Sequence, residues 1–210
     1  MLRRVRARPG QRLGAPSAPR GRALAIGAAT CAAAALTASF AFAAASKTVT
    51  LADPKSDVTG ALDLQRTSLN LASDGRLREV VTLTDELGPE AMLAKSGPPG
   101  SICVKVWTAK DADPTANPAD RLVCVTAKSK DALRASVLSQ TAAGLPVVVG
   151  PAEVKATKSK RSLVVRFSQS SLARPELIRF AFESTRPGCE RVSCVDQSPD
   201  KGAVRRFRVR

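Results

Sequence analysis

The chain has 210 residues, with 33 Lys and Arg against 18 Asp and Glu, a formal net charge of +15, and no His or Tyr. His is the usual general base near neutral pH and the commonest metal ligand, so this composition excludes Ser-His-Asp and Cys-His catalysis and His-ligated metal sites. The phosphate-binding patterns GxGxxG and GK[ST] and the nucleophile pattern GxSxG are also missing. We therefore expect a protein that is not an enzyme.

The first 45 residues have the composition of a secretory signal peptide. Residues 1–22 carry seven Arg and no acid, residues 23–46 carry no charge, and small-x-small cleavage patterns occur within residues 41–45. A basic segment, an apolar segment and such a pattern, in this order, are typical of exported proteins. We expect residues 1–45 to be removed and residues 46–210 to form one extracytoplasmic domain. The alternative is a protein anchored in the membrane by an uncleaved N-terminal segment.

The mature part predicts short strands that are separated by turns rich in Pro, Gly and Asp. Apolar and polar residues alternate over 162–167, 177–183 and 205–210, as in antiparallel strands with one wet face. We expect an all-β protein that forms an antiparallel two-sheet sandwich, with a closed barrel as the alternative. A hairpin around Gly75 pairs Leu71 with Leu77 but sets Leu69 against Glu79, so its register stays open.

Four cysteines remain after the signal peptide, and an even number in an exported chain favours disulfides. Placing Cys103 opposite Cys124 on two antiparallel strands sets apolar Val104 against apolar Val123, a match that a slip of one residue destroys. This pattern predicts the Cys103–Cys124 bond on the outer face. By elimination, Cys189 pairs with Cys194.

The pattern D-P-x-x-D-x-x-G-x-L-D-L over residues 53–64 resembles the opening of exported bacterial β-sandwich modules. These are the modules grouped with the family 9 carbohydrate-binding and DOMON-like domains. The resemblance implies a structural Ca²⁺ held by Asp53, Asp57 and Asp63. Asp196 and Asp200 are further candidate ligands if the chain ends meet, because Ca²⁺ takes six to eight oxygen ligands. The alternative is that each Asp stabilises a turn.

Basic residues are concentrated near the C-terminus, and an exported protein meets anionic envelope polymers or acidic polysaccharide more often than nucleic acid. Few aromatic residues accompany the charge, so we expect no nucleic-acid partner. Charged side chains that keep an edge strand from pairing are the alternative reading of the last strand. The predicted polyanion-binding residues are Arg205, Arg206, Arg208, Arg210, Lys158, Lys160 and Arg161, with Lys155 and Arg166 nearby.

Trp107 is the single Trp of the chain and is expected on the outer face, beside Cys103. An exposed Trp there is a candidate platform for a sugar or a partner. The alternative is an indole that covers the sheet or the disulfide.

These features together predict an exported, non-catalytic binding or structural module of the cell envelope. It would contact an anionic polymer or polysaccharide through the basic C-terminal third, without stable insertion into the membrane once the signal is cleaved. The alternative is a secreted protein-binding factor, such as a protease inhibitor that presents the loop from Arg186 to Cys194.

Overall fold

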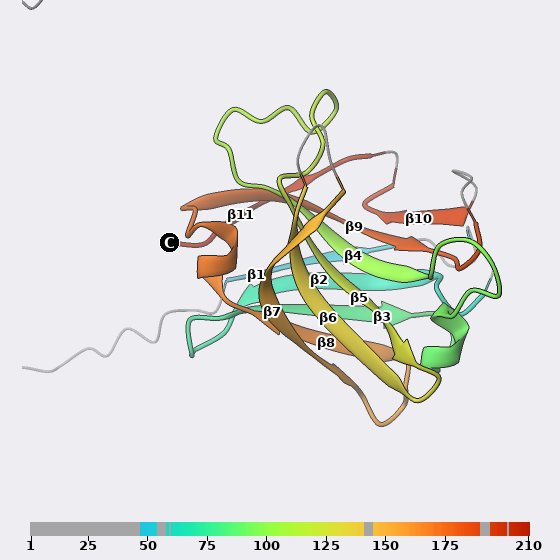
Figure 1. The fold of residues 1–210 in the computed structure, drawn as a ribbon. Coiled ribbons are helices and arrows are strands. Elements are labelled where there is room, and N and C mark those ends of the chain that lie inside the picture. Colours follow the sequence, from blue (N-terminus) through green and yellow to red (C-terminus); the bar gives the residue numbers. More distant parts are fainter. Residues whose placement is uncertain (1–46, 54–57, 59, 141–144, 190–193, 201) are drawn as a thin grey trace, which may run out of the picture. The chain divides into compact units, whose positions relative to one another are not determined.

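The structure is a computed structural model that describes residues 47–53, 58, 60–140, 145–189, 194–200 and 202–210 (Figure 1). The strands are β1 (Thr48–Ala52), β2 (Leu64–Leu71), β3 (Leu77–Leu83), β4 (Ser101–Trp107), β5 (Arg121–Ser129), β6 (Ala132–Ser139), β7 (Val147–Ala156), β8 (Ser162–Phe167), β9 (Leu177–Thr185), β10 (Val195–Ser198) and β11 (Arg205–Arg208). Two short 3-10 helices are also present, η1 (Pro89–Met92) and η2 (Gln169–Leu172). The all-β prediction is confirmed.

The predicted signal peptide lies outside the described residues and stays a prediction. None of the helices in the described ranges has the length and apolar character that a membrane span requires.

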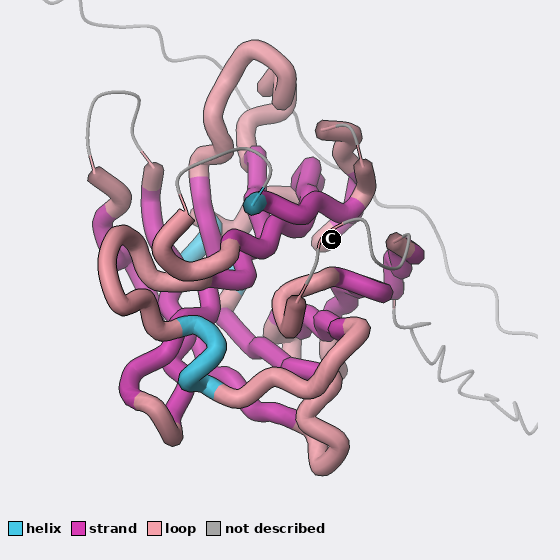
Figure 2. Tube along the Cα trace, turned by 90° about the vertical axis from the view of Figure 1, so that its right-hand side faces the viewer, coloured by secondary structure: helices cyan, strands magenta, loops and turns pink. Residues whose placement is uncertain are grey.

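All the strands belong to one antiparallel sheet, in the order β1-β2-β3-β8-β7-β6-β5-β4-β9-β10, with β11 paired to β9 beside β10. The sheet curls until it is nearly barrel-shaped, because β10 at one end contacts β2, the second strand from the other end (Figures 1 and 2). The strands are therefore not divided between the two sheets of a sandwich, and the barrel alternative describes them better. Alternation along a strand shows only that one face is buried, which is common to both architectures.

Side chains connect β2 to β10, which share no ladder in the strand order. The backbone N–H of Leu64 on β2 donates to Oδ2 of Asp196 on β10 at 2.6 Å, and both residues are almost fully buried. The hydroxyls of Thr67 and Ser198 lie 3.3 Å apart between the same two strands. The segment around Leu64 thus meets the segment around Asp196, as a shared site of Asp63 and Asp196 requires.

We expect Asp196→Ala to lower the free energy of unfolding by about 2 kcal/mol, because it leaves the buried N–H of Leu64 without its charged acceptor. Asp196→Asn keeps an acceptor oxygen and should lose less. Denaturant unfolding measures both changes, with half-exposed Asp200→Ala as the control. Equal losses for Asp196→Ala and Asp200→Ala would contradict a closing role for Asp196.

The inward-facing side chains of the sheet form the hydrophobic core. Phe180 lies edge-on to both Phe182 and Phe207, with ring centroids 5.7 and 6.5 Å apart. Phe207 and Val209 are buried while Arg206 and Arg208 point outward, which is the alternation predicted for the last strand. The C-terminal strand is thus fixed by apolar contacts and leaves its cations in solvent.

One acidic side chain lies in this core. The hairpin between β2 and β3 pairs Leu71 with Leu77 and Leu69 with Glu79, and its irregularity lies further along, between Leu64 and Arg66. Glu79 is 0% exposed, and neither carboxyl oxygen has a hydrogen-bond partner in the described part of the chain. Removal from water disfavours the charged form and raises the pKa of Glu79 to about 8.

Both predicted disulfides are present. Cys103 and Cys124 are direct neighbours on β4 and β5, and Val104 pairs with Val123 in the predicted register. Cys189 pairs with Cys194 across a separation of five residues. Disulfides are typical of proteins that fold in an oxidising, extracytoplasmic environment.

Candidate anion-binding surface

The outer faces of β3, β8 and β7 bring three cations together. Arg78 on β3 is directly opposite Arg166 on β8, and Arg166 is in turn opposite Glu153 on β7. Lys155 lies two residues along β7 from Glu153 and so points to the same face, diagonal to Arg166. Neighbouring strands are about 4.8 Å apart, so these side chains reach one another.

The acid on this face already has a partner. Nη2 of Arg76, the residue before β3, lies 3.1 Å from Oε1 of Glu153, so the ion pair spans β8. The hydrogen bond to Glu153 raises the pKa of the Arg76 guanidinium, and the same contact lowers the pKa of the Glu153 carboxyl. Both groups are accessible to solvent, so we assign the pair no stability. The charges of Lys155 and Arg166 also contribute to lowering the pKa of Glu153.

Arg78, Lys155 and Arg166 take part in no salt bridge within the described ranges. The three side chains line a hollow of about 230 Å³, whose wall also includes Val164 and the carboxylate of Glu153. Like charges directly opposite each other on neighbouring strands destabilise a sheet. A bound anionic group would relieve this repulsion, so the arrangement is suited to phosphate, sulfate or carboxylate groups.

The turn that joins β7 to β8 extends this charge to one end of the sheet. The N–H of Lys160 donates to the carbonyl of Thr157 within the turn, and the N–H groups of Leu83 and Leu87 donate to the carbonyls of Arg161 and Lys160. The backbone is thus fixed while the charged side chains are exposed. We call the following residues the basic hairpin surface: Arg78, Lys155, Lys158, Lys160, Arg161 and Arg166.

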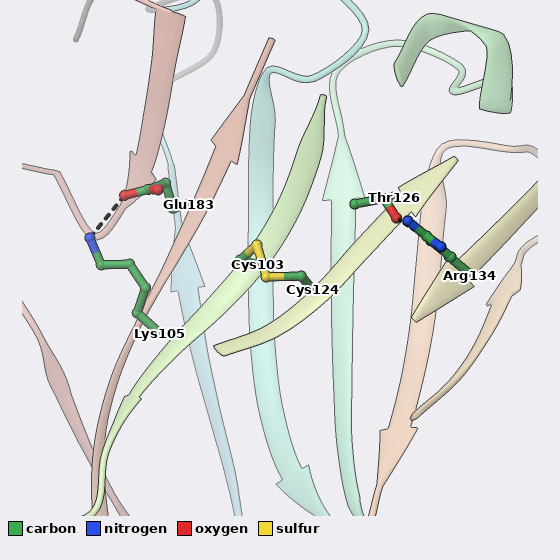
Figure 3. The surroundings of a disulfide bond; sticks show 6 residues. All are labelled: Cys103, Lys105, Cys124, Thr126, Arg134 and Glu183. Atoms are coloured by element: carbon green, nitrogen blue, oxygen red, sulfur yellow. Dashed lines mark hydrogen bonds and ion pairs between the residues drawn. A yellow bond between two sulfur atoms is a disulfide. The ribbon is translucent and has the colours of Figure 1, made fainter. Parts of the chain in front are cut away.

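On the outer face of β4 and β9, a lysine is paired with an acid (Figure 3). Nζ of Lys105 lies 2.8 Å from Oε2 of Glu183, which also accepts a hydrogen bond from Gln197. Beside this pair, the disulfide joins β4 and β5, and Nε of Arg134 donates to Thr126.

The structure does not bring together all seven predicted polyanion-binding residues. Lys158, Lys160 and Arg161 lie at the turn before β8. The chain leaves the other end of β8 through η2 and enters β9, and there Leu177 pairs with Arg208. Arg205, Arg206, Arg208 and Arg210 therefore lie at the other end of the strands (Figure 1). The first three belong to β11 and Arg210 follows it; β11 pairs only with β9 in the described structure, as the edge-strand alternative requires.

Trp107 lies on the outer face but is only 4% exposed. The loop after β4 covers the ring: Nε1 of Trp107 donates to the carbonyl of Asn117 at 2.9 Å, and Ala119 and Ala181 pack against the indole. The indole therefore offers no open face for stacking, and its arrangement matches the covering alternative.

The predicted calcium ligands are placed only in part. Asp53 and Asp63 are buried near the start of β2, and Asp57 lies outside the described residues. Asp196 comes close to them through its bond to Leu64. No group of three or more His, Cys, Asp or Glu side chains in the described ranges has the arrangement of a metal site. Ca²⁺ at Asp53, Asp57 and Asp63 stays a prediction.

Sequence reasoning missed Arg78. Alternation places Arg78 on an outer face, but its importance comes from the pairing of β3 with β8, which sets it against Arg166 much further along the chain. No local pattern indicates that pairing.

Comparison of the chain with protein-family models, with curated proteins and with solved structures gives no match. The resemblance to family 9 carbohydrate-binding and DOMON-like modules stays a prediction.

Proposed function

We propose that the chain is an exported, non-catalytic binding or structural module of the cell envelope. It contacts an anionic polymer or polysaccharide through its basic C-terminal third, and the basic hairpin surface makes the main contact. The observation that carries the proposal is the opposition of Arg78 and Arg166, with Lys155 beside them and the neighbouring acid already paired. The two disulfides support an extracytoplasmic location.

An extended polymer fits this surface better than a small ligand does. The hollow between Arg78 and Arg166 is small, and the exposed turn that carries Lys158 and Lys160 follows directly after Ala156 of its wall. Repeated anionic groups along one chain would meet these cations in succession. Exposed contacts of this kind are screened by salt, so binding should be strong at low ionic strength and weak at high ionic strength.

The test is binding of the oxidised protein to linear polyphosphate over a series of salt concentrations. Replacing Arg78, Lys155 and Arg166 by Ser should reduce the slope of log affinity against log salt by about 2 to 3, because fewer counterions are released. A matched control replaces the exposed Lys47, Lys95 and Lys128 by Ser and removes the same charge outside the basic hairpin surface.

An equal effect of the two triple variants would show that only net charge matters and would refute the assigned surface. No binding of the unaltered protein at low salt would refute the polymer-binding function. The protein-binding alternative would then be favoured.

A further inference from the structure

A second charged feature lies at the end of the sheet away from the turn between β7 and β8. A cleft of about 580 Å³ is bounded by the start of β9, the end of the C-terminal strand and the segment that follows β4. This volume is within the range of small-molecule sites. The residues that define its chemistry are Lys110, Pro175, Glu176, Leu177, Arg208 and Arg210.

The backbone on both sides of the cleft is held in place. The N–H of Val209 donates to the carbonyl of Glu176 at 2.7 Å, which fixes the C-terminal strand against the start of β9. On the other side, the guanidinium of Arg179 donates to the carbonyl of Lys110 at 2.9 Å. The cations thus come from two segments about a hundred residues apart in the chain and are positioned by the fold.

The cleft combines three kinds of contact. Lys110, Arg208 and Arg210 are donors with positive charge, which suit an anionic group. Glu176 is an exposed carboxylate that can only accept hydrogen bonds when ionised, so it disfavours a bare anion and favours a ligand with hydroxyls. Pro175 and Leu177 add apolar surface beside Glu176.

We propose that this cleft binds a single sugar residue that carries an anionic group. The anionic group lies against Arg208, Arg210 and Lys110, the sugar hydroxyls donate to Glu176, and the carbon face of the ring contacts Leu177. This site lies in the basic C-terminal third of the proposed function, but it is separate from the main polymer contact because it shares no residue with the basic hairpin surface.

The test is calorimetric titration of the full-length protein with glucuronate, glucose 6-phosphate, glucose and inorganic phosphate. At least one of the two sugar acids should bind more tightly than both glucose and phosphate. Preference for glucuronate identifies a carboxylate sugar, and preference for glucose 6-phosphate identifies a phosphosugar. Phosphate binding as tightly as both sugar acids, or no binding of either sugar acid, overturns the proposal.

Two variants test the assigned residues. Replacing Arg208 and Arg210 by Ser should weaken binding of the preferred sugar acid about tenfold, because charged hydrogen bonds are lost. Replacing Arg205 and Arg206 by Ser removes the same charge from the same strand outside the cleft and should leave the affinity unchanged. Equal losses in the two variants overturn the proposal.

The carboxylate of Glu176 provides a separate readout. Glu176→Leu should weaken binding of the sugar acid while strengthening that of inorganic phosphate, because it removes both the hydroxyl acceptor and a repulsive charge. Stronger binding of both ligands would overturn the role of Glu176 and the sugar assignment. The variant lacking Arg78, Lys155 and Arg166 should bind the sugar acid normally, which separates this site from the polymer contact.

Discussion

The free energy of unfolding is expected to fall by about 3 to 4 kcal/mol between pH 5 and pH 8 because of Glu79 alone. Its pKa is about 8 in the folded protein and near the ordinary glutamate value when unfolded. The folded state therefore keeps a proton that the unfolded state has lost. This stabilisation is complete below the unfolded pKa and is lost as the pH rises to the folded pKa.

No charged side chain from the neighbouring strands counteracts this effect. Glu79 pairs with Leu69 on β2 and Val165 on β8, which are both fully buried, and desolvation is the sole cause of the shift. Along the core face of β8, the residues on either side of Val165 are Leu163 and Phe167. Ionised Glu79 would therefore lie among apolar side chains without a counterion.

Denaturant unfolding at several pH values measures this effect as the difference between the unaltered protein and Glu79→Gln. The Gln variant should lose the slope between pH 5 and pH 8, and Glu79→Leu should also be more stable at pH 8. Glu153→Gln is the control, because the pKa of Glu153 is lowered and its effect lies at acid pH. A Gln variant with the same slope as the unaltered protein would refute the buried, neutral state of Glu79.

Loss of the Cys103–Cys124 bond is expected to lower the free energy of unfolding by about 3 kcal/mol, against about 2 kcal/mol for Cys189–Cys194. The first bond joins residues 21 apart and the second joins residues five apart, so the first restricts the unfolded chain more. Double Cys→Ser variants of each pair, unfolded by denaturant under oxidising conditions, give the comparison. A larger loss for the Cys189–Cys194 pair would contradict this chain-entropy account.

Local patterns were sufficient where two strands lie close together in the chain. The register of β4 and β5 follows from matching Val104 with Val123 once Cys103 is set against Cys124, and the structure has this register. The hairpin of β2 and β3 was harder to predict, because the alternation placed Glu79 on an apolar face. In the structure, Glu79 pairs with Leu69 without a bulge and its carboxyl is buried. The alternation therefore predicted the correct face for Glu79, although burial of a carboxyl is energetically unfavourable.

Long-range pairing was beyond the sequence. Nothing near Arg78 indicates that Arg166 lies opposite, and nothing near β11 indicates that its arginines lie far from Lys160. The single curled sheet also has no local signal, because each strand in it buries one face. Trp107 was placed on the correct face, but the loop that covers it was not anticipated.

The way in which the sheet closes has a consequence for its dynamics. Most neighbouring strands share a ladder of backbone hydrogen bonds, but β2 and β10 are joined by side chains, among them Asp196 to the N–H of Leu64. Breaking a few such contacts costs less free energy than breaking a ladder of backbone hydrogen bonds, so partial opening should begin between β2 and β10. Because β2 also pairs with the strand that carries Glu79, opening along β2 and β10 should increase the access of solvent to the buried carboxyl.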